Sequence, residues 1–112
     1  IRFASDIVTL KKYLKNIYEG EHLAKQLVRS GTSAALNFGE VQGAETTKDF
    51  IHKQSIVLKE LRETYINLRI IELNGLCINL SLLSQVLDES DQLIRIFTRS
   101  IQTSKRNQAI SK

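Results

Sequence analysis

Two short motifs in this 112-residue chain have the spacing of metal ligands. Glu19 and His22, and likewise Asp49 and His52, stand three residues apart, as in the di-metal carboxylate sites of helical bundles. If two helices form a hairpin that turns near residue 44, His22 lies about 22 Å along the axis from the level of His52. Paired metals are about 4 Å apart. We therefore interpret both histidines as surface or capping residues and predict no metal and no cofactor.

Other residue types that take part in catalysis lack the arrangement that catalysis needs. Glu60 and Glu63 are one turn apart, but the same hairpin places Arg29 level with Glu60 and Gln26 level with Glu63. Arg29 can then bridge to either acid, which favours a structural ion pair over general acid–base chemistry. Cys77 is the single thiol, so it can form neither an intrachain disulfide nor a zinc site alone. The chain has no glycine-rich phosphate loop. We predict that the protein is not an enzyme.

A row of polar residues at helical spacing runs along the segment that follows residue 21. This row is either a solvated face or a hydrogen-bonded seam against the next helix, where buried polar groups would have to be paired. The candidate seam comprises Gln26, Arg29, Ser33, Asn37, Glu40, Lys53, Glu60 and Glu63. Replacing Arg29 by Ala separates the two interpretations, because stability falls strongly only if the acids are buried.

Basic residues are concentrated at the two ends of the chain. The net charge is +4, and every residue after Asp91 that carries a charge is basic, including Lys112. If the first and fourth helices are neighbours, the bundle brings these ends together as a phosphate-binding surface. The candidate nucleic-acid-binding residues are Arg2, Arg95, Arg99, Lys105 and Arg106. Few aromatic residues lie among them, so base stacking is not expected.

These residues are positioned by helices. The chain has no Pro and only five Gly, and its apolar residues recur at steps of three and four. The pattern predicts one domain over residues 1–112 with helices at about 3–18, 21–41, 47–74 and 81–104, separated at Gly20, Gly43 and Gly75. Thr46 or Thr47 is the expected N-cap of the third helix, and the tail after residue 103 is expected to fray.

Short connections between four helices predict an all-α, antiparallel, up-down-up-down four-helix bundle. The third helix is apolar over a wider arc than one core needs, because Ile56, Ile66, Ile70 and Leu73 lie outside its main stripe, so it is expected to lie centrally or to meet a second chain. No segment has the length of a membrane span or the pattern of a secretion signal, which indicates a cytoplasmic protein. The absence of Met at position 1 suggests that a few residues are missing before Ile1.

The polar positions at fixed spacing also carry a resemblance to a known family. The stretch from Leu23 to Glu40 contains Arg29-Ser-Gly-Thr-Ser33 and Asn37-Phe-Gly-Glu40, and the stretch from Lys48 to Thr64 contains Leu58-Lys-Glu60-Leu-Arg-Glu63-Thr64. Together they resemble the proteins encoded in intervening sequences of bacterial large-subunit ribosomal RNA genes. That family is related to the accessory variability determinant of diversity-generating retroelements. This chain has Tyr65-Ile66-Asn67 where many relatives resemble Tyr-Trp-Leu.

The resemblance implies a four-helix bundle that assembles into a ring, a homopentamer. For the retroelement relatives it also implies binding to a reverse transcriptase and to nucleic acid through basic surface. Two functions follow as hypotheses. The first is a nucleic-acid-associated adaptor that uses the basic end formed by the first and fourth helices. The alternative is a purely structural or protein-binding scaffold with no role for RNA or DNA.

Overall fold

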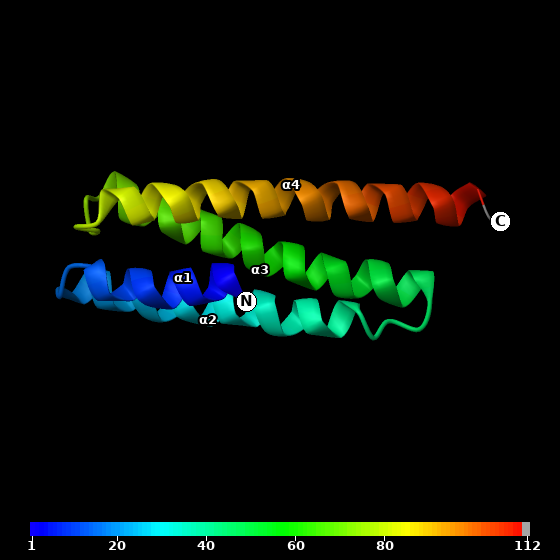
Figure 1. The fold of residues 1–112 in the computed structure, drawn as a ribbon, viewed down its shortest axis with the longest axis horizontal. Helices are drawn as coiled ribbons and strands as arrows, with labels where there is room; N and C mark the ends of the chain where they lie inside the picture. The colour runs from blue at the N-terminus through cyan, green and yellow to red at the C-terminus, as the bar shows by residue number, and fades with distance from the viewer. Residues whose placement is uncertain (111–112) are drawn as a thin grey trace.

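The computed structural model describes residues 1–110, which fold into four α-helices. They are α1 (Arg2–Leu10), α2 (Tyr18–Val41), α3 (Thr47–Leu73) and α4 (Leu80–Ile110), with a 3-10 turn, η1 (Lys11–Tyr13), after α1. The described residues contain no β-strand, which confirms the all-α class with four helices. The helices align along one axis in a molecule of 54 × 20 × 20 Å (Figure 1).

Successive helices are joined at alternate ends of this elongated molecule. Figure 1 shows the α2–α3 connection at one end and the α3–α4 connection at the other. Helix α3 contacts both α2 and α4, and α1 contacts the same two helices. Because α1 is short, the N-terminus lies near the middle of the long axis (Figure 1). The molecule is therefore four helices thick over one half of its length and three helices thick over the other.

Both ends of α3 lie where the sequence signals put them. The Thr46 side-chain oxygen accepts a hydrogen bond of 3.0 Å from the backbone N–H of Asp49, so Thr46 is the N-cap. The carboxylate of Asp49 lies in the first turn, where the helix dipole favours negative charge. At the other end Gly75 has a φ of +61°, a left-handed conformation that favours glycine after a helix. The observed helix matches the predicted 47–74 to within one residue.

The first helix is shorter than the predicted span of residues 3–18. Helix α1 ends at Leu10, η1 tightens the next three residues, and Leu14 is extended, with a ψ of 142°. The chain then bends at Asn16, where the N–H of Ile17 donates to the carbonyl of Lys15 at 2.9 Å, and Ile17 is the N-cap of α2. Apolar residues at helical spacing, including Leu14 and Ile17, thus continue past the end of the helix itself.

Long-range backbone hydrogen bonds explain why α1 stops. Leu14 forms an isolated antiparallel bridge with Cys77, in the connection between α3 and α4. The two hydrogen bonds that flank it run from the N–H of Lys15 to the carbonyl of Leu76 (2.7 Å) and from the N–H of Ile78 to the carbonyl of Tyr13 (2.9 Å). Backbone groups that would otherwise continue the helix are satisfied by this pairing instead.

Gly20 was expected to separate the first two helices, but it lies inside the first turn of α2, which begins at Tyr18. A Cβ atom on Gly20 would collide with the backbone carbonyl oxygen of Lys15. Glycine is therefore required here for close approach of the extended segment, and the break in the chain falls at residues 14–17.

Helix α4 is longer than predicted. It runs from Leu80 to Ile110, whereas the pattern predicted 81–104 followed by a frayed tail. Residues 103–110 contain no Gly or Pro and include good helix formers, so nothing local ends the helix there. Residues 111 and 112 of the expected tail, including the basic Lys112, lie outside the described part of the chain.

The apolar core is divided into two clusters along the long axis. One cluster lies around α1 and includes Ile7, Leu27, Leu68 and Val86. Leu76 and Cys77 belong to it, so the apolar connection after α3 packs over the end of the bundle. The second cluster comprises Ala34, Val41, Val57, Leu58, Leu61, Phe97 and Ile101. The half-buried Phe3 packs against both clusters and links them.

A groove remains where no fourth helix covers the second cluster. It has a volume of about 260 Å³ and begins at the N-terminal end of α1. Val57 and Leu61 of α3 line it together with Phe38 and Phe97, whose rings meet edge to face at 5.8 Å. Phe38 is half-exposed here, because no fourth helix covers this part of the second cluster.

Candidate nucleic-acid interface

The second half of α4 carries its basic residues on one exposed face. Arg95, Arg99 and Arg106 are separated by four and seven residues, and both steps return to nearly the same side of an α-helix. The buried Phe97 lies on the opposite side, so the three guanidinium groups extend from the surface. This row of three residues is called the arginine stripe below. Lys105 is exposed beside it.

The stripe is only partly neutralised by acidic groups. Arg95 forms an ion pair of 3.2 Å with Asp91, one turn earlier, and both side chains are largely exposed. Such an exposed pair contributes little to stability and is open to competition by phosphate. Arg99, Lys105 and Arg106 have no ion pair with an acidic side chain of residues 1–110, and no acid occurs after Asp91.

Arg2 lies apart from the basic end of α4. The next residue, Phe3, lines the same groove as Leu93 and Phe97 of α4. The start of α1 therefore lies beside residues 93–97 of α4. Lys105 is eight residues beyond Phe97, or roughly 12 Å further along the axis. The expectation that the bundle brings Arg2 to Lys105 and Arg106 differs from the observed fold, because α1 begins halfway along the molecule (Figure 1).

Of the eight residues in the candidate polar seam, only Arg29, Glu60 and Glu63 form ion pairs between α2 and α3. Arg29 of α2 pairs with Glu63 of α3 at 3.0 Å and with Glu60 at 3.5 Å. The hydrogen bond to Glu63 and the charge of Glu60 raise the pKa of Arg29 above its ordinary value. The Arg29 side chain is 60% exposed and that of Glu60 only 14%, so the cluster lies at the surface over a half-buried acid.

The other seam residues do not join α2 to α3. The amide of Asn37 donates to the carbonyl and hydroxyl oxygens of Ser33, one turn earlier in the same helix. Lys53 pairs with Asp49 within α3, at 3.2 Å. Gln26 and Glu40 are exposed. Most of the predicted row is therefore a solvated helix face.

Uncharged side chains make the buried polar contacts instead. Thr64 is fully buried, and its hydroxyl donates to the hydroxyl oxygen of Ser30 at 2.7 Å, which joins α3 to α2. Gln54 donates to the Ser100 hydroxyl at 2.8 Å and joins α3 to α4. Sequence reasoning missed these residues. The available signal was helical spacing: Thr64 lies three residues after the core residue Leu61 and four before Leu68, and Gln54 lies about two helical turns before Leu61.

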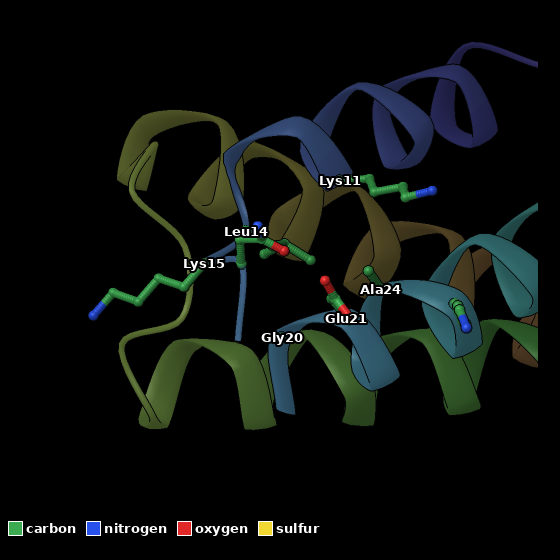
Figure 2. Close-up of a pocket in the computed structure, with 8 residues that line it drawn as sticks. Lys11, Leu14, Lys15, Gly20, Glu21 and Ala24 are labelled. Carbon is green, nitrogen blue, oxygen red and sulfur yellow. The ribbon is translucent and has the colours of Figure 1, made fainter. Parts of the chain in front are cut away.

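A hollow of about 360 Å³ at the N-terminus of α2 does not form an anion site. It lies between η1 and α2 and is lined by Lys11, Lys15 and Glu21, among others. In Figure 2 the side chains of Lys11 and Lys15 point in opposite directions, while Glu21 lies between them. Cations that diverge around a carboxylate do not converge on a phosphate.

The residues whose types could bind a metal or take part in catalysis, His22, His52 and Cys77, do not lie together in one site. His22 stacks on Tyr18 with ring centroids 6.1 Å apart, and His52 is exposed on α3. Within residues 1–110, no three His, Cys, Asp or Glu side chains gather closely enough to hold a metal ion. Cys77 is buried, and this burial raises the pKa of its thiol.

Among the described helices, none combines the length and apolar character of a membrane span.

The fold and its surface thus define a small helical-bundle protein with a basic helix end and a surface ion-pair cluster between α2 and α3. The family model for 23S rRNA-intervening sequence proteins matches residues 1–99. The chain belongs to this family, as the motifs around Arg29 and Glu60 indicated.

A solved structure shares this architecture. It is the crystal structure of a protein with unknown function from the S23 ribosomal protein family of Bacteroides thetaiotaomicron. The two chains are 32% identical, the comparison covers 89% of this chain and 92% of the other, and the TM-score is 0.76. No curated protein matches the chain.

Proposed function

We propose that this protein is a non-enzymatic adaptor of the cytoplasm that binds RNA or DNA as a ring-like homo-oligomer. In this proposal each copy is an antiparallel, up-down-up-down bundle, and five copies form the ring. The observation that carries the proposal is the arginine stripe of α4, which is exposed and followed by no acid. A reverse transcriptase or another protein is the second partner that such an adaptor would connect to nucleic acid.

The geometry of the stripe suits contacts with a phosphate backbone. Arg95 and Arg106 are eleven residues apart, or roughly 16 Å along α4. One strand of a duplex advances 3.4 Å per phosphate, so the stripe spans roughly five phosphates. No aromatic side chain lies on the same face of α4. Binding is therefore expected to depend on salt and to be indifferent to sequence.

Repetition of the stripe in a ring strengthens the argument. A single copy offers three arginines and Lys105, which corresponds to weak binding at physiological salt. Several copies that engage one nucleic acid together multiply this affinity without any new kind of contact. The homo-oligomer is therefore the form in which the surface would act.

Titration of a labelled RNA hairpin and a labelled DNA duplex, followed by anisotropy at a series of salt concentrations, tests the proposal. Replacing Arg99 and Arg106 together by Gln removes two phosphate contacts per copy. We expect weaker binding to every sequence and a salt slope, log K against log [salt], smaller by about 2 for each copy engaged.

The matched control removes the same net charge from another helix. Lys59→Gln with Arg62→Gln changes two exposed bases of α3 and leaves α4 intact. An equal loss of affinity in both double variants would mean that overall charge, not the stripe, binds nucleic acid. Absence of binding by the wild-type oligomer at low salt would overturn the proposal.

The alternative function is a structural or protein-binding scaffold without a nucleic-acid role. The observation that favours it is the set of exposed apolar side chains on α3, which suit a protein partner and not a phosphate backbone. Under this alternative the wild-type protein assembles normally but gives no anisotropy change with either nucleic acid.

A further inference from the structure

The end of α3 carries the one asparagine in the sequence that is followed by glycine. Asn74 and Gly75 are both exposed, and they stand between the last turn of the helix and the buried residues Leu76 and Cys77. The backbone nitrogen that follows an asparagine can attack the side-chain amide of that asparagine, and a side chain on the attacking residue hinders the approach. Glycine has no side chain. Asn74 is therefore the asparagine of this chain that such an attack reaches with the least steric resistance.

The closed form of this helix end holds both reacting groups. The N–H of Gly75 donates to the carbonyl of Glu72 at 3.2 Å. The side-chain amide of Asn74 donates to the carbonyl of Ile70 at 2.8 Å. Both hydrogen bonds lie at the exposed end of a helix, where local opening requires little free energy. The attack is therefore slow in the closed form and proceeds when the helix end frays.

The chain directly after this pair is held from two sides. The N–H of Leu76 donates to the carbonyl of Ile71 at 3.1 Å, which completes a Schellman motif at the end of α3. The carbonyl of Leu76 accepts a hydrogen bond of 2.7 Å from the N–H of Lys15. Cys77, the next residue, is 5% exposed and pairs with Leu14. A change in backbone length just before Leu76 cannot preserve both of its hydrogen bonds.

We propose that Asn74 is a site of self-modification, whose conversion to aspartate and isoaspartate releases the connection that buries Cys77. The backbone nitrogen of Gly75 gives its proton to solvent hydroxide and bonds to Cγ of Asn74, while the Cγ–Nδ2 bond breaks and the amide nitrogen leaves as ammonia. Water then opens the cyclic imide at one of its two carbonyl carbons. Opening at Cγ gives aspartate, and opening at the main-chain carbon gives isoaspartate, in which the chain runs through Cγ. This inference goes beyond the proposed function and requires neither nucleic acid nor a second copy.

Both products act against the closed helix end. A carboxylate cannot donate to the carbonyl of Ile70, as the amide of Asn74 does. It also adds negative charge near Glu72, at the C-terminus of a helix, where the dipole is negative as well. Isoaspartate further adds one carbon atom to the backbone before Leu76. The Schellman motif and the contact with Lys15 are then expected to open together.

Ageing of the full chain in warm, mildly alkaline buffer, followed by peptide mapping with mass spectrometry, tests the modification. We expect aspartate and isoaspartate to accumulate in place of Asn74. Asn16 and Asn107 are exposed as well but precede larger residues, and their amides are expected to persist. A synthetic peptide of residues 70–80 is the unfolded reference, and its conversion is expected to be roughly tenfold faster, because the folded chain must first open.

Two results of this mapping would overturn the proposal. One is an intact Asn74 in the folded protein after the peptide has been fully converted. The other is equal conversion of Asn74 and Asn16 in the folded protein, which would mean that glycine has no special effect here.

The rate at which Cys77 reacts with a thiol reagent tests the release. Protein aged under reducing conditions is expected to react several-fold faster than fresh protein, because the thiol is buried in the unmodified chain. Asn74→Gln is the matched control, since its longer side chain does not form the same ring and the amide is retained. Ageing is expected to leave its thiol rate unchanged. Conversion of Asn74 without a faster thiol reaction, or equal acceleration in Asn74→Gln, would overturn the release.

A direct substitution separates the effect of the new charge at this place from the effect of charge in general. Asn74→Asp creates the aspartate product and is expected to lower the urea midpoint. Asn16→Asp makes the same change on the N-terminal side of α2, where the helix dipole favours negative charge, and is expected not to lower it. Circular dichroism shows whether both variants are folded. An equal fall of the midpoint in both would overturn the account of the α3 end.

Discussion

At the scale of single residues, the contact between α2 and α3 has a buried part and an exposed part. Thr64 and Ser30 share a hydrogen bond of 2.7 Å at positions that water does not reach. Arg29 pairs with Glu60 and Glu63 at the surface, where water and salt screen the charges. The buried hydroxyl pair is therefore expected to matter more to stability than the charged cluster.

Urea denaturation of two variants measures this difference. Thr64→Val keeps the shape of the side chain but removes the hydrogen bond to Ser30, and we expect a loss of about 1 kcal/mol. Arg29→Ala is expected to lower the urea midpoint less, because the guanidinium is 60% exposed, and of the two acids only Glu60, 14% exposed, loses its partner away from water. That result corresponds to the solvated interpretation of the polar row.

Thr98→Val is the control for the hydroxyl, because Thr98 donates only to Ile94 in its own helix, at 2.7 Å. It is expected to change stability by less than about 0.5 kcal/mol. A midpoint that falls further for Arg29→Ala than for Thr64→Val would contradict this account of the α2–α3 contact.

The sequence allowed the charged contact to be anticipated but not the buried one. Counting residues from a turn near 44 placed Arg29 level with Glu60, and the two are 3.5 Å apart. The same count places Ser30 level with Lys59 and not with Thr64, and because Ser and Thr occur throughout the chain nothing local marks the buried pair. Burial depends on which helix face meets a neighbour, and that is a tertiary property.

At the scale of elements, the join between α1 and α2 is the least regular part of the fold. Residues 13–15 pair with the α3–α4 connection, and the chain then bends at residues 16–17 and enters α2 at Tyr18. Gly20 lies in the first turn of α2, against the backbone of Lys15. The bridge to Cys77 ties the two connections at this end of the molecule together.

Two glycine substitutions in α2, one at the close contact with Lys15 and one in open space, test this geometry. Gly20→Ala introduces a Cβ where the Lys15 carbonyl lies, and we expect it to cost about 1–3 kcal/mol of unfolding free energy. Gly39→Ala adds the same atom in open space within the same helix, and we expect a gain of about 0.5–1 kcal/mol. Urea unfolding followed by circular dichroism gives both values.

If both substitutions stabilised the protein by similar amounts, the close approach of Lys15 to Gly20 would be excluded. A second readout is the thiol of Cys77, which is buried in the wild type. Loss of the bridge in the Gly20→Ala variant is expected to speed its reaction with a thiol reagent, while Gly39→Ala leaves that rate unchanged.

The end of α1 could not be read from periodicity. Phe3, Ile7, Leu10, Leu14 and Ile17 keep helical spacing, but only the first three are helical. A periodic pattern shows which residues are apolar at helical steps and contains no information about a connection far along the chain that pairs with them. The pairing of Leu14 with Cys77 is such a long-range event, and it ends the helix.

At the scale of the whole molecule, thickness varies along the axis. The first core cluster is surrounded by all four helices, while the second is left partly open beyond the start of α1. The last buried residue of α4 is Ile101, and the helix continues for nine more residues to Ile110. Figure 1 shows this end of α4 extending past the α2–α3 connection.

Amide hydrogen exchange is expected to follow this gradient. Amides of residues 83–97, on the core-facing part of α4, should exchange only through larger unfolding events, whereas residues 102–110 should open by local fraying. We expect protection at least ~100-fold lower in the second segment, measured by mass spectrometry on the free protein. Uniform protection along α4 would contradict the picture of an uncovered helix end.

The sequence by itself determined the all-α class, the limits of α3, a threonine cap at Thr46 or Thr47, and the concentration of bases after Asp91. These features depend on the spacing of residues a few positions apart, where helix periodicity and capping act. Only the tertiary structure decided that α1 stops at Leu10, that Arg2 lies away from Lys105, and that the polar row is mostly solvated. Each of these results depends on contacts between segments distant in the chain, whose energies no local pattern contains.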